Sequence, residues 1–513
     1  MLIYFSVANY KSFRDKADFN MIASPLYDSK ETEDHVFRGY IPHLLRTSAI
    51  YGSNGAGKSN LLEALGTLKR IICGNYYKNA ASETLYYKLE DSYKDKPTEF
   101  EAEYIAEGKR FVYHLAILSD KIIQEWLSEV DENGNPSIIF NREFKENGEV
   151  IKMPVYEQNE KETLRLEIYA EELAKKKLRT YLEYGATHGV KELSTAYEWF
   201  LKQLEVVSPG AQLVDRLSFF SNPQMLSLAV EMIRALDLSI NDLKVVSVPF
   251  DEMFSNAFPQ NNIEEIKNRV VNDKRTVIVK RDGMEFQVYK DEDDNIMAGR
   301  LITIHKNGVE FELNEESTGT RMVLDLIPSF VASIVGNKIF VFDEIEVNKH
   351  PELTKELIMI YLLAGNIHKG QLIFTTHECN LLDLDILRPD EIWFVEKDDN
   401  EASHIYSLSD FKPHYGKDIK KGYLDGKFTR IPFFTDPKQL KWYGNTESAD
   451  NADSSDTASE SGPTHLMNLR FMGSNSKQRV PTAPKVCRYS IRFVFSRLSC
   501  SAGNPSSPCI ALQ

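Results

Sequence analysis

The sequence has few cysteines, no long apolar run and no surplus of basic residues, and each shortage excludes a class of protein. Only five of its 513 residues are cysteines. They form no Cys-x-x-Cys pair, and three of them follow residue 480, so their spacing supports neither a disulfide framework nor a zinc site. We expect Cys73 and Cys379 to be reduced thiols in or near the core.

The sequence also has fewer basic residues than acidic ones. The 76 acidic residues outnumber the 61 basic ones, which disfavours nonspecific attraction of the whole surface to nucleic acid but leaves room for a local basic patch. The lysines of "ELAKKKLR" are interleaved with Glu171, Glu172 and Glu183, which is typical of a solvated helix face. A nucleic-acid partner therefore stays open but is not indicated.

Long apolar runs are absent as well. No segment reaches the roughly 18 apolar residues of a membrane span, and the start, "MLIYFSVANYKSF", shows no basic region followed by an apolar run of signal length. We expect no membrane segment and a cytoplasmic protein. The composition, 42% hydrophobic and 27% charged, is that of an ordinary globular protein.

The sequence does contain an alternation of strand-like and helix-like segments, which predicts an α/β fold interrupted once. Residues 1–155 read as strands and turns around one helix, with a hairpin that turns at Glu107 and Gly108. Residues 156–244 have a helical period, and residues 245–435 alternate strands and helices again. One α/β unit split by a helical insertion accounts for this order.

Two further patterns concern the insertion and the end of the chain. Five apolar residues of the insertion lie close to one face of a helix: Leu164, Ile168, Leu173, Leu178 and Leu182. After about residue 436, the serine- and acid-rich run "NTESADNADSSDTASESGP" cannot bury enough apolar surface to order itself. We expect residues 436–513 to be a disordered tail, with a regulatory or docking segment, or sequence foreign to the ancestral domain, as alternatives.

A glycine-rich stretch, "YGSNGAGKSN", has the spacing of a phosphate-binding loop. Gly52, Gly57, Lys58 and Ser59 satisfy GxxxxGK[ST]. The glycines let backbone N–H groups turn toward a β-phosphate, the lysine reaches the β/γ oxygens, and the serine hydroxyl takes Mg²⁺. The loop follows the apolar stretch "TSAIY" and precedes a helical pattern from Leu61, which favours a nucleotide site over an ordinary glycine turn.

The acids that complete such a site are found in "NKIFVFDEIE". Asp343 and Glu344 follow a buried strand, so Asp343 would hold Mg²⁺ through water and Glu344 would orient or deprotonate the attacking water. An apolar run ending in two acids is common at strand ends, and the pairing with the glycine loop is what carries this prediction. Asp343 follows Lys58 by 285 residues, which is the layout of split ABC-type heads.

Two weaker motifs agree with this layout. "NEESTGTRMVLDLIPSF" places Ser317, Thr318, Gly319 and Thr320 before a helix, where free amides and the positive end of the dipole face an anion. Taken alone, this stretch is an ordinary N-cap. "QLIFTTHE" is a strand that ends in His377, whose imidazole could bond a γ-phosphate or the attacking water. A histidine at a strand end is usually structural, and only its place in the order of motifs favours function.

In this order of motifs the chain resembles the stand-alone ABC-like AAA ATPases related to the ATPase half of the OLD (overcoming lysogenization defect) proteins. That group includes components of bacterial abortive-infection and phage-defence systems. The resemblance covers about residues 1–435 and rests on "VANYKSF", the GxNGxGKSN form of the loop, "ESTGTR", "FDEIEVNKHPEL", "FTTHE", "IWFVEKDDNEASHIYSLSDFKP" and "GYLDGKFTRIP". It implies a P-loop NTPase of ABC-head type, an α/β fold split by a helical insertion.

The resemblance also implies the site residues. ATP would be bound by Gly52, Ser53, Asn54, Gly55, Ala56, Gly57, Lys58, Ser59 and Asn60, together with the signature residues Ser317 and Gly319. Ser59 and Asp343 would hold Mg²⁺, and Glu344 and His377 would be catalytic. Asn348 and His350 would lie in the D-loop.

The sequence departs from the family pattern at two points. ABC heads use a glutamine between loop and signature, and Gln124 in "KIIQEWLSE", with Glu125 beside it, is the only candidate. OLD proteins carry a C-terminal Toprim nuclease, and nothing after Pro432 offers an acidic, strand-rich domain of that kind. Any nuclease or toxin activity would then come from a partner.

Three functions fit these observations. The first is an ATPase that forms a homodimer or higher homo-oligomer with ATP at the interface and so controls a separate effector in antiviral defence. The second is an ATPase of the RecF or SMC type that acts in DNA repair or maintenance, against which stand the acidic balance and the absence of long heptad arms. The third is a non-hydrolysing scaffold in which ATP only holds an assembly together.

Overall fold

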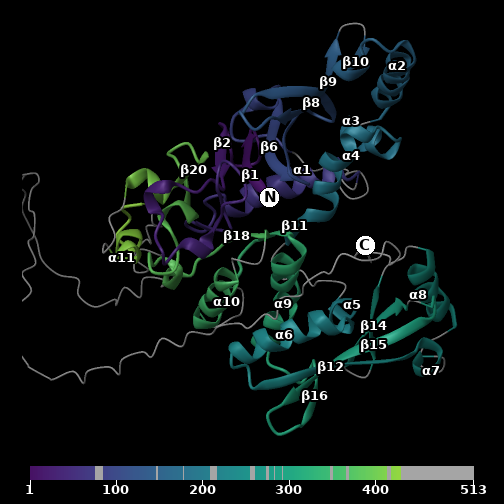
Figure 1. Ribbon diagram of the computed structural model, residues 1–513, viewed down its shortest axis with the longest axis vertical. Helices are drawn as coiled ribbons and strands as arrows, with labels where there is room; N and C mark the ends of the chain where they lie inside the picture. The colour runs from purple at the N-terminus through teal and green to yellow at the C-terminus, as the bar shows by residue number, and fades with distance from the viewer. Residues whose placement is uncertain are drawn as a thin grey trace, which may run out of the picture. The chain divides into compact units, whose positions relative to one another are not determined.

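Figure 1 shows the computed structural model of the chain. It describes residues 1–428 except 75–84, 146–147, 177, 208–215, 255–259, 273–275, 282–283, 292, 347–350, 365–368 and 413–417. The chain divides into two units, Met1–Phe433 and Phe434–Gln513, and every described residue belongs to the first. The tail predicted at 436–513 lies outside the described residues and stays a prediction.

A six-stranded sheet organises the described unit, with the strand order β11-β17-β18-β5-β19-β20. Neighbouring strands are parallel except for the last pair, β19 and β20. The strands are β5 (Thr47–Tyr51), β11 (Leu204–Val207), β17 (Ile339–Phe342), β18 (Gln371–Thr375), β19 (Ile392–Lys397) and β20 (Ser403–Ser407). The α/β fold class predicted from the sequence is confirmed.

Both faces of this sheet are buried, which explains why its strands are continuous apolar runs. Side chains alternate between the faces. Ile50 joins a hydrophobic cluster with the first helix and the antiparallel sheet described below, whereas Ala49 and Tyr51 join a second cluster on the other face. Val341 and Phe342 are divided in the same way. Each strand of the predicted site is thus fixed from two sides.

A seven-stranded antiparallel sheet packs on one side, in the order β10-β9-β8-β7-β6-β1-β2. Its strands are β1 (Leu2–Ala8), β2 (Ala17–Asn20), β6 (Thr98–Ala106), β7 (Lys109–Leu118), β8 (Lys121–Val130), β9 (Pro136–Lys145) and β10 (Gly148–Lys152). The hairpin predicted at Glu107 and Gly108 is confirmed, since both residues have positive φ between β6 and β7. Helix α1 (Lys58–Ile72) contacts β1 of this sheet and β11 of the other.

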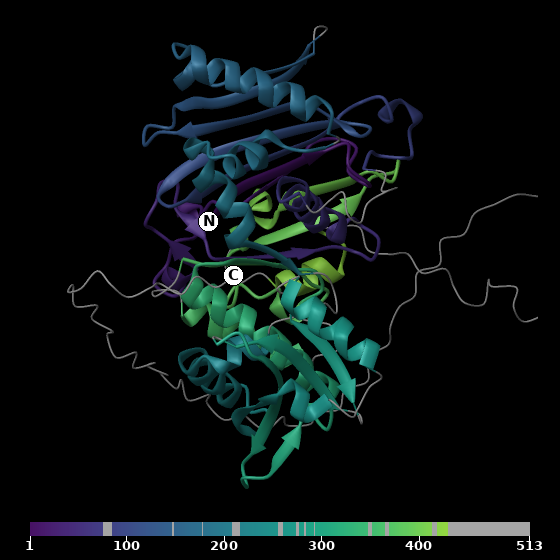
Figure 2. The ribbon, with the colours of Figure 1, turned by 90° about the vertical axis from the view of Figure 1, so that its right-hand side faces the viewer.

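The segment that we expected to be helical opens with α2 (Glu160–Ala174), α3 (Tyr181–Thr187), α4 (Lys191–Glu198) and a π-helical turn, Trp199–Gln203. Figure 2 shows α2 along the strands near β10, which it contacts. The single amphipathic helix predicted through Leu182 is wrong, because α2 ends at Ala174 and Leu178 has a φ of 50°. Leu164 and Ile168 are 58% and 49% exposed, since α2 buries its Leu166 and Leu173 face instead.

A strand also lies within this segment. β11 directly follows the π-helical turn and pairs in parallel with β17. Residues 204–207 therefore belong to the central sheet rather than to a helical insertion. The apolar periodicity of the sequence could not reveal this strand, because a run as short as "LEVV" fits a strand and a helix equally well.

Residues 240–312 form a third sheet, which the sequence did not single out. β12 (Ile240–Pro249), β15 (Ile296–His305), β14 (Met284–Lys290) and β13 (Val277–Arg281) follow in that order, with β16 (Glu310–Glu312) beside β15. Helices α7 (Phe250–Phe254) and α8 (Gln260–Asn272) help to enclose a small core of its own. Helices α5 (Arg216–Ser221) and α6 (Pro223–Ala235) contact β12.

Helix α9 (Thr318–Gly336) is the one helix among the described residues that is long and apolar enough to cross a membrane by length and composition. The sequence analysis did not single it out in this respect. Its apolar residues Val323, Leu324, Ile327 and Phe330 are buried in the second hydrophobic cluster, and the helix contacts α6 and β17. Packing in the core thus accounts for its hydropathy. Helices α10 (Pro351–Leu363) and α11 (Ile419–Leu424) complete the list.

Glu125, one of the two candidates for the ABC-type glutamine loop, is the centre of a buried polar network. Its carboxylate accepts hydrogen bonds from the Tyr113 hydroxyl and from Arg142, each at 3.0 Å. It also accepts the backbone N–H groups of Tyr181 at 2.7 Å and Leu182 at 2.9 Å. The candidacy of Glu125 is wrong, because its fully buried side chain joins β8, β9 and α3.

Removing this carboxylate should destabilise the fold. Glu125→Ala leaves the Arg142 charge short of a buried partner, so we expect the free energy of unfolding to fall by about 3–5 kcal/mol. Urea denaturation measures this change. Gln124→Ala, the neighbouring residue on β8, is the control and should cost less than about 1 kcal/mol. Equal losses in both variants would contradict the role of the network.

Candidate functional site

The glycine loop joins the carboxyl end of β5 to the start of α1, as the sequence predicts. Gly57 is the N-cap residue of α1, and its φ of 116° lies in the region that favours glycine. A Cβ on Gly57 would lie 2.4 Å from the Ser403 Oγ, and one on Gly52 would lie 2.3 Å from the Val395 carbonyl oxygen. Both positions need glycine because their neighbours approach too closely for a side chain.

Hydrogen bonds from distant segments hold this loop. The Ser403 hydroxyl donates to the Ala56 carbonyl at 2.6 Å, and the Ser403 N–H donates to the Ser12 carbonyl at 2.8 Å. The Asn60 side-chain amide donates to the Ser12 hydroxyl at 2.7 Å. The loop is therefore fixed between β20 and the turn after β1, with the N-terminus of α1 at its end. Such a preorganised helix N-terminus suits an anion.

Lys58 folds back over the loop. Its ammonium donates to the carbonyl oxygens of Gly52 at 2.9 Å and Ser53 at 3.2 Å, and the residue is buried. Burial lowers the pKa of the Lys58 ammonium, while the carboxylates of Asp343 and Glu344 act in the opposite direction. The predicted lysine and the predicted acids therefore lie within electrostatic reach of one another.

The two acids follow β17 at the same edge of the sheet and are fixed by one hydroxyl. The Thr375 hydroxyl donates to Oδ1 of Asp343 at 2.6 Å and accepts the backbone N–H of Glu344 at 2.7 Å. Thr375 is fully buried at the end of β18. The sequence analysis missed this residue, although "FTTHE" placed it two positions before the predicted histidine.

Glu344 has a backbone φ of 53°. This left-handed conformation is uncommon for a residue other than glycine, asparagine or aspartate, and it persists only where the surroundings enforce it. The bond from its N–H to Thr375 and the bond from the Ile345 N–H to the Thr375 carbonyl, at 3.2 Å, supply that constraint. These two bonds therefore fix the backbone of the turn after Asp343.

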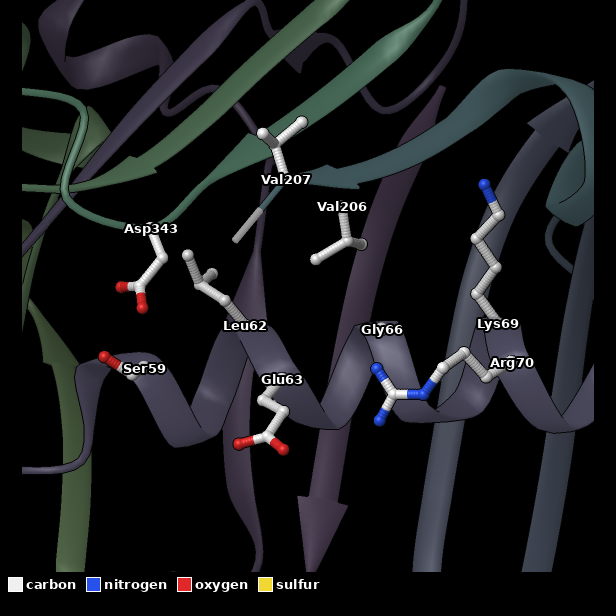
Figure 3. A pocket seen from close by; sticks show the side chains of 9 residues that line it. All are labelled: Ser59, Leu62, Glu63, Gly66, Lys69, Arg70, Val206, Val207 and Asp343. Carbon is white, nitrogen blue, oxygen red and sulfur yellow. The ribbon is translucent and has the colours of Figure 1, made fainter. Parts of the chain in front are cut away.

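Ser59 and Asp343 line one groove of about 390 Å³ beside α1 and β11. Figure 3 shows the Asp343 carboxylate and the Ser59 hydroxyl on the same side of this groove, at the start of α1. The other lining residues are Leu62, Glu63, Gly66, Lys69, Arg70, Val206 and Val207. The predicted metal pair, 284 positions apart in the sequence, is thus brought to one place.

A hydroxyl and a carboxylate are donors that suit Mg²⁺, which takes few protein ligands and keeps several waters and substrate oxygens. Within the described ranges, no group of three or more His, Cys, Asp or Glu side chains could hold a metal ion. The donor set therefore fits a magnesium ion shared with a phosphate.

His377 follows β18 two residues after Thr375. Partial burial of the imidazole, and then the Lys58 ammonium, lower its pKa. This shift favours the neutral ring, which can donate one hydrogen bond and accept another. The acids Glu346, Glu344 and Asp343 act on it in the opposite direction, so His377 belongs to the same cluster of charges as the loop lysine.

The signature residues begin α9 rather than precede it. Ser317 is the N-cap, and its hydroxyl accepts the Thr320 N–H at 3.1 Å. Gly319 lies in the first turn. Among the described residues, the hydrogen bonds of Ser317 stay within this turn. The N-terminus of α9 is exposed and capped by Ser317, and in the described part no hydrogen bond joins it to the glycine loop, so its contact with an anion stays a prediction.

Of the remaining predicted residues, one lies elsewhere and two are not described. Gln124 pairs with Ala116 and Glu143 inside the antiparallel sheet, so its candidacy is wrong. Asn348 and His350 lie outside the described residues.

Comparison with known protein families gives a match that covers most of the candidate site. The family described as "AAA domain, putative AbiEii toxin, Type IV TA system" matches residues 48–383. This range begins in β5 and includes the loop, the signature, both acids and His377. Comparison with curated proteins gives no match.

Comparison with solved structures finds matches among SMC heads. The SMC head domain from Thermotoga maritima is 12% identical with a TM-score of 0.33, over 79% of this chain and 98% of that one. An SmcHead bound to the C-winged helix domain of ScpA is 14% identical with a TM-score of 0.34, over 80% and 99%. A Pyrococcus furiosus Smc head with an extended coiled coil, bound to the C-terminal domain of ScpA, is 14% identical with a TM-score of 0.33, over 80% and 97%. At these scores the likeness supports no argument about function.

Proposed function

The chain belongs to the AAA-domain family whose description names a putative AbiEii toxin of a type IV TA system, and from this premise we propose a Mg²⁺-dependent ATPase that acts in antiviral defence. It is a P-loop NTPase of ABC-head type. We further propose that ATP drives its dimerisation in the cytoplasm, that the dimer controls a separate effector protein, and that the chain is related to the ATPase half of OLD proteins.

One observation carries the ATPase proposal. The predicted site residues follow the carboxyl ends of three parallel strands, around a preorganised helix N-terminus. They are Lys58 and Ser59 at the start of α1 after β5, Asp343 and Glu344 after β17, and His377 after β18. Two of the three N–H bonds of the Lys58 ammonium are used on loop carbonyls, which leaves the third for the β/γ oxygens of ATP.

Each residue then has a distinct part in hydrolysis. Ser59 and Asp343 would hold a magnesium ion, which would supply positive charge to the phosphate oxygens. Glu344 takes the proton of the attacking water while the water oxygen bonds to the γ-phosphorus and the bond to the β–γ bridging oxygen breaks. His377 donates a hydrogen bond to the γ-phosphate, and ADP leaves with the bridging oxygen. The bond from its N–H to Thr375 fixes the Glu344 backbone for this step.

Two substitutions separate binding from hydrolysis. Lys58→Ala removes the cation that the loop presents, so ATP binding or turnover should be lost while the fold stays intact.

Glu344→Gln leaves Asp343 unchanged as the residue that would hold Mg²⁺. This variant should bind ATP normally, but kcat should fall roughly 100-fold or more. A phosphate-release assay and nucleotide titration measure both. Wild-type turnover in either variant would remove that residue from the mechanism, and a wild type that binds ATP without turnover would favour the scaffold.

The position of the signature supports a site shared between two copies. Ser317 and Gly319 present an exposed helix N-terminus, and the hydrogen bonds of Ser317 in the described part stay within its own turn. We propose that this turn meets the γ-phosphate on the loop of a second subunit, with Asn348 and His350 near the seam. ATP binding and dimerisation are then linked by mass action.

Mixing two inactive variants tests this arrangement. Lys58→Ala lacks a working loop and Ser317→Arg lacks a working signature, so a mixed dimer holds one site made of two unmutated halves. We expect ATPase activity to reappear on mixing, up to about one quarter of the wild-type rate if copies pair at random. Lys58→Ala mixed with itself is the control. If activity does not reappear although mixed dimers have formed, the two copies do not share sites that work independently of each other. A covalently linked dimer with one mutated half-site would then show whether both sites must work together.

The role in defence is supported by the family description and by the resemblance to OLD-related ATPases. We expect the chain, expressed with its neighbouring genes in a bacterial host, to lower phage plating efficiency. Lys58→Ala and omission of single neighbouring genes should abolish this protection. Equal protection by Lys58→Ala would contradict an ATP-dependent role, and salt-dependent binding of duplex DNA without any protection would favour the RecF or SMC type of function.

A further inference from the structure

Glu346 lies two residues after Glu344 in the turn that follows β17, and no motif in the sequence assigns it a function. One oxygen of its carboxylate, Oε1, accepts the backbone N–H of His377. The other oxygen, Oε2, is buried and has no hydrogen-bond partner among the described residues. A buried carboxylate oxygen without a partner costs free energy, and such groups in native structures call for an explanation.

The charges around Glu346 place it inside the site. Its negative charge acts on the Lys58 ammonium, on the His377 imidazole and on the buried Tyr51 hydroxyl at the end of β5. Among the acids, its effect on His377 is larger than those of Glu344 and Asp343. The Glu346 carboxylate therefore lies close enough to Lys58 of the glycine loop and to His377 for its charge to act on both.

Four hydrogen bonds among the described residues join the turn after β17 to the end of β18 and to the turn that follows it. Thr375 bonds to Asp343 and Glu344 through its hydroxyl and to Ile345 through its carbonyl oxygen. Only the bond from Glu346 reaches His377 itself. The position of the histidine thus depends on a side chain from the neighbouring turn.

We propose that Glu346 is the positioning residue of His377. Its carboxylate holds the His377 backbone so that the imidazole faces the γ-phosphate, and it ties the histidine to the same turn that carries Glu344. This inference rests on the proposed ATPase function for its kinetic test, but the contact itself can be tested without nucleotide.

Amide hydrogen exchange of the nucleotide-free protein tests the contact. Glu346→Ala should raise the exchange rate at the His377 amide at least tenfold, because its acceptor is lost. Glu346→Gln keeps an acceptor oxygen and should retain most of the protection. Glu378→Ala is the matched control, since the Glu378 carboxylate accepts the Asn380 N–H instead. Unchanged exchange in Glu346→Ala would overturn the proposal.

ATP hydrolysis tests the consequence. Glu346→Ala should lower kcat roughly 10- to 100-fold with little change in KM, as expected for a misplaced group, while Glu346→Gln and Glu378→Ala should stay within about threefold of the wild type. In a His377→Ala background, Glu346→Ala should have almost no further effect on kcat, because the two residues act as a unit. Additive losses, or a loss of ATP binding in Glu346→Ala, would overturn the proposal.

The two experiments separate this inference from the proposed function. If the wild type hydrolyses no ATP, the ATPase proposal fails, whereas the exchange data still decide whether Glu346 holds His377. If the wild type is active and the exchange or the kinetic cycle fails, only the role of Glu346 is wrong.

Discussion

The parallel arrangement of β5, β17 and β18 is the constraint on which the rest of the structure depends. Parallel strands end at the same edge of a sheet, so residues that follow each of them meet even when the chain between them is long. Lys58, Asp343 and His377 meet in this way. Because both faces of the sheet are buried, a shift of one strand by one residue would exchange its two sets of apolar side chains. The packing therefore fixes the register on which the site relies.

Buried polar contacts add a second level of constraint between segments far apart in the sequence. The Gln371 side chain accepts the Leu2 N–H at 2.6 Å and donates to the Leu2 and Leu45 carbonyls, each at 3.0 Å. Such groups are costly to leave unpaired, so they select one arrangement of strands. The hydrogen bonds of Ser403 act in the same manner, since they fix the glycine loop from β20, the outermost strand of the sheet.

Much of the candidate site could be predicted from the sequence because its parts are local. The glycine loop, the Asp343–Glu344 pair and the His377 strand end are each short motifs next to a strand or helix. The errors came where the signal was not local. Glu125 was a candidate for the glutamine loop because its order in the chain fitted, but its burial beside Arg142 and α3 depends on tertiary packing. Leu164 and Ile168 fitted a helical face that the fold leaves exposed.

The sequence by itself determined the phosphate loop, the order of the motifs and the α/β class, because local spacing and apolar periodicity are enough to specify a strand, a loop and a helix. Only the tertiary structure decided that β11 joins the central sheet, that Thr375 holds both acids and that Glu346 holds His377. These contacts join segments that the chain brings together from different strands, and no local pattern records which side chains will face one another once the sheet has formed.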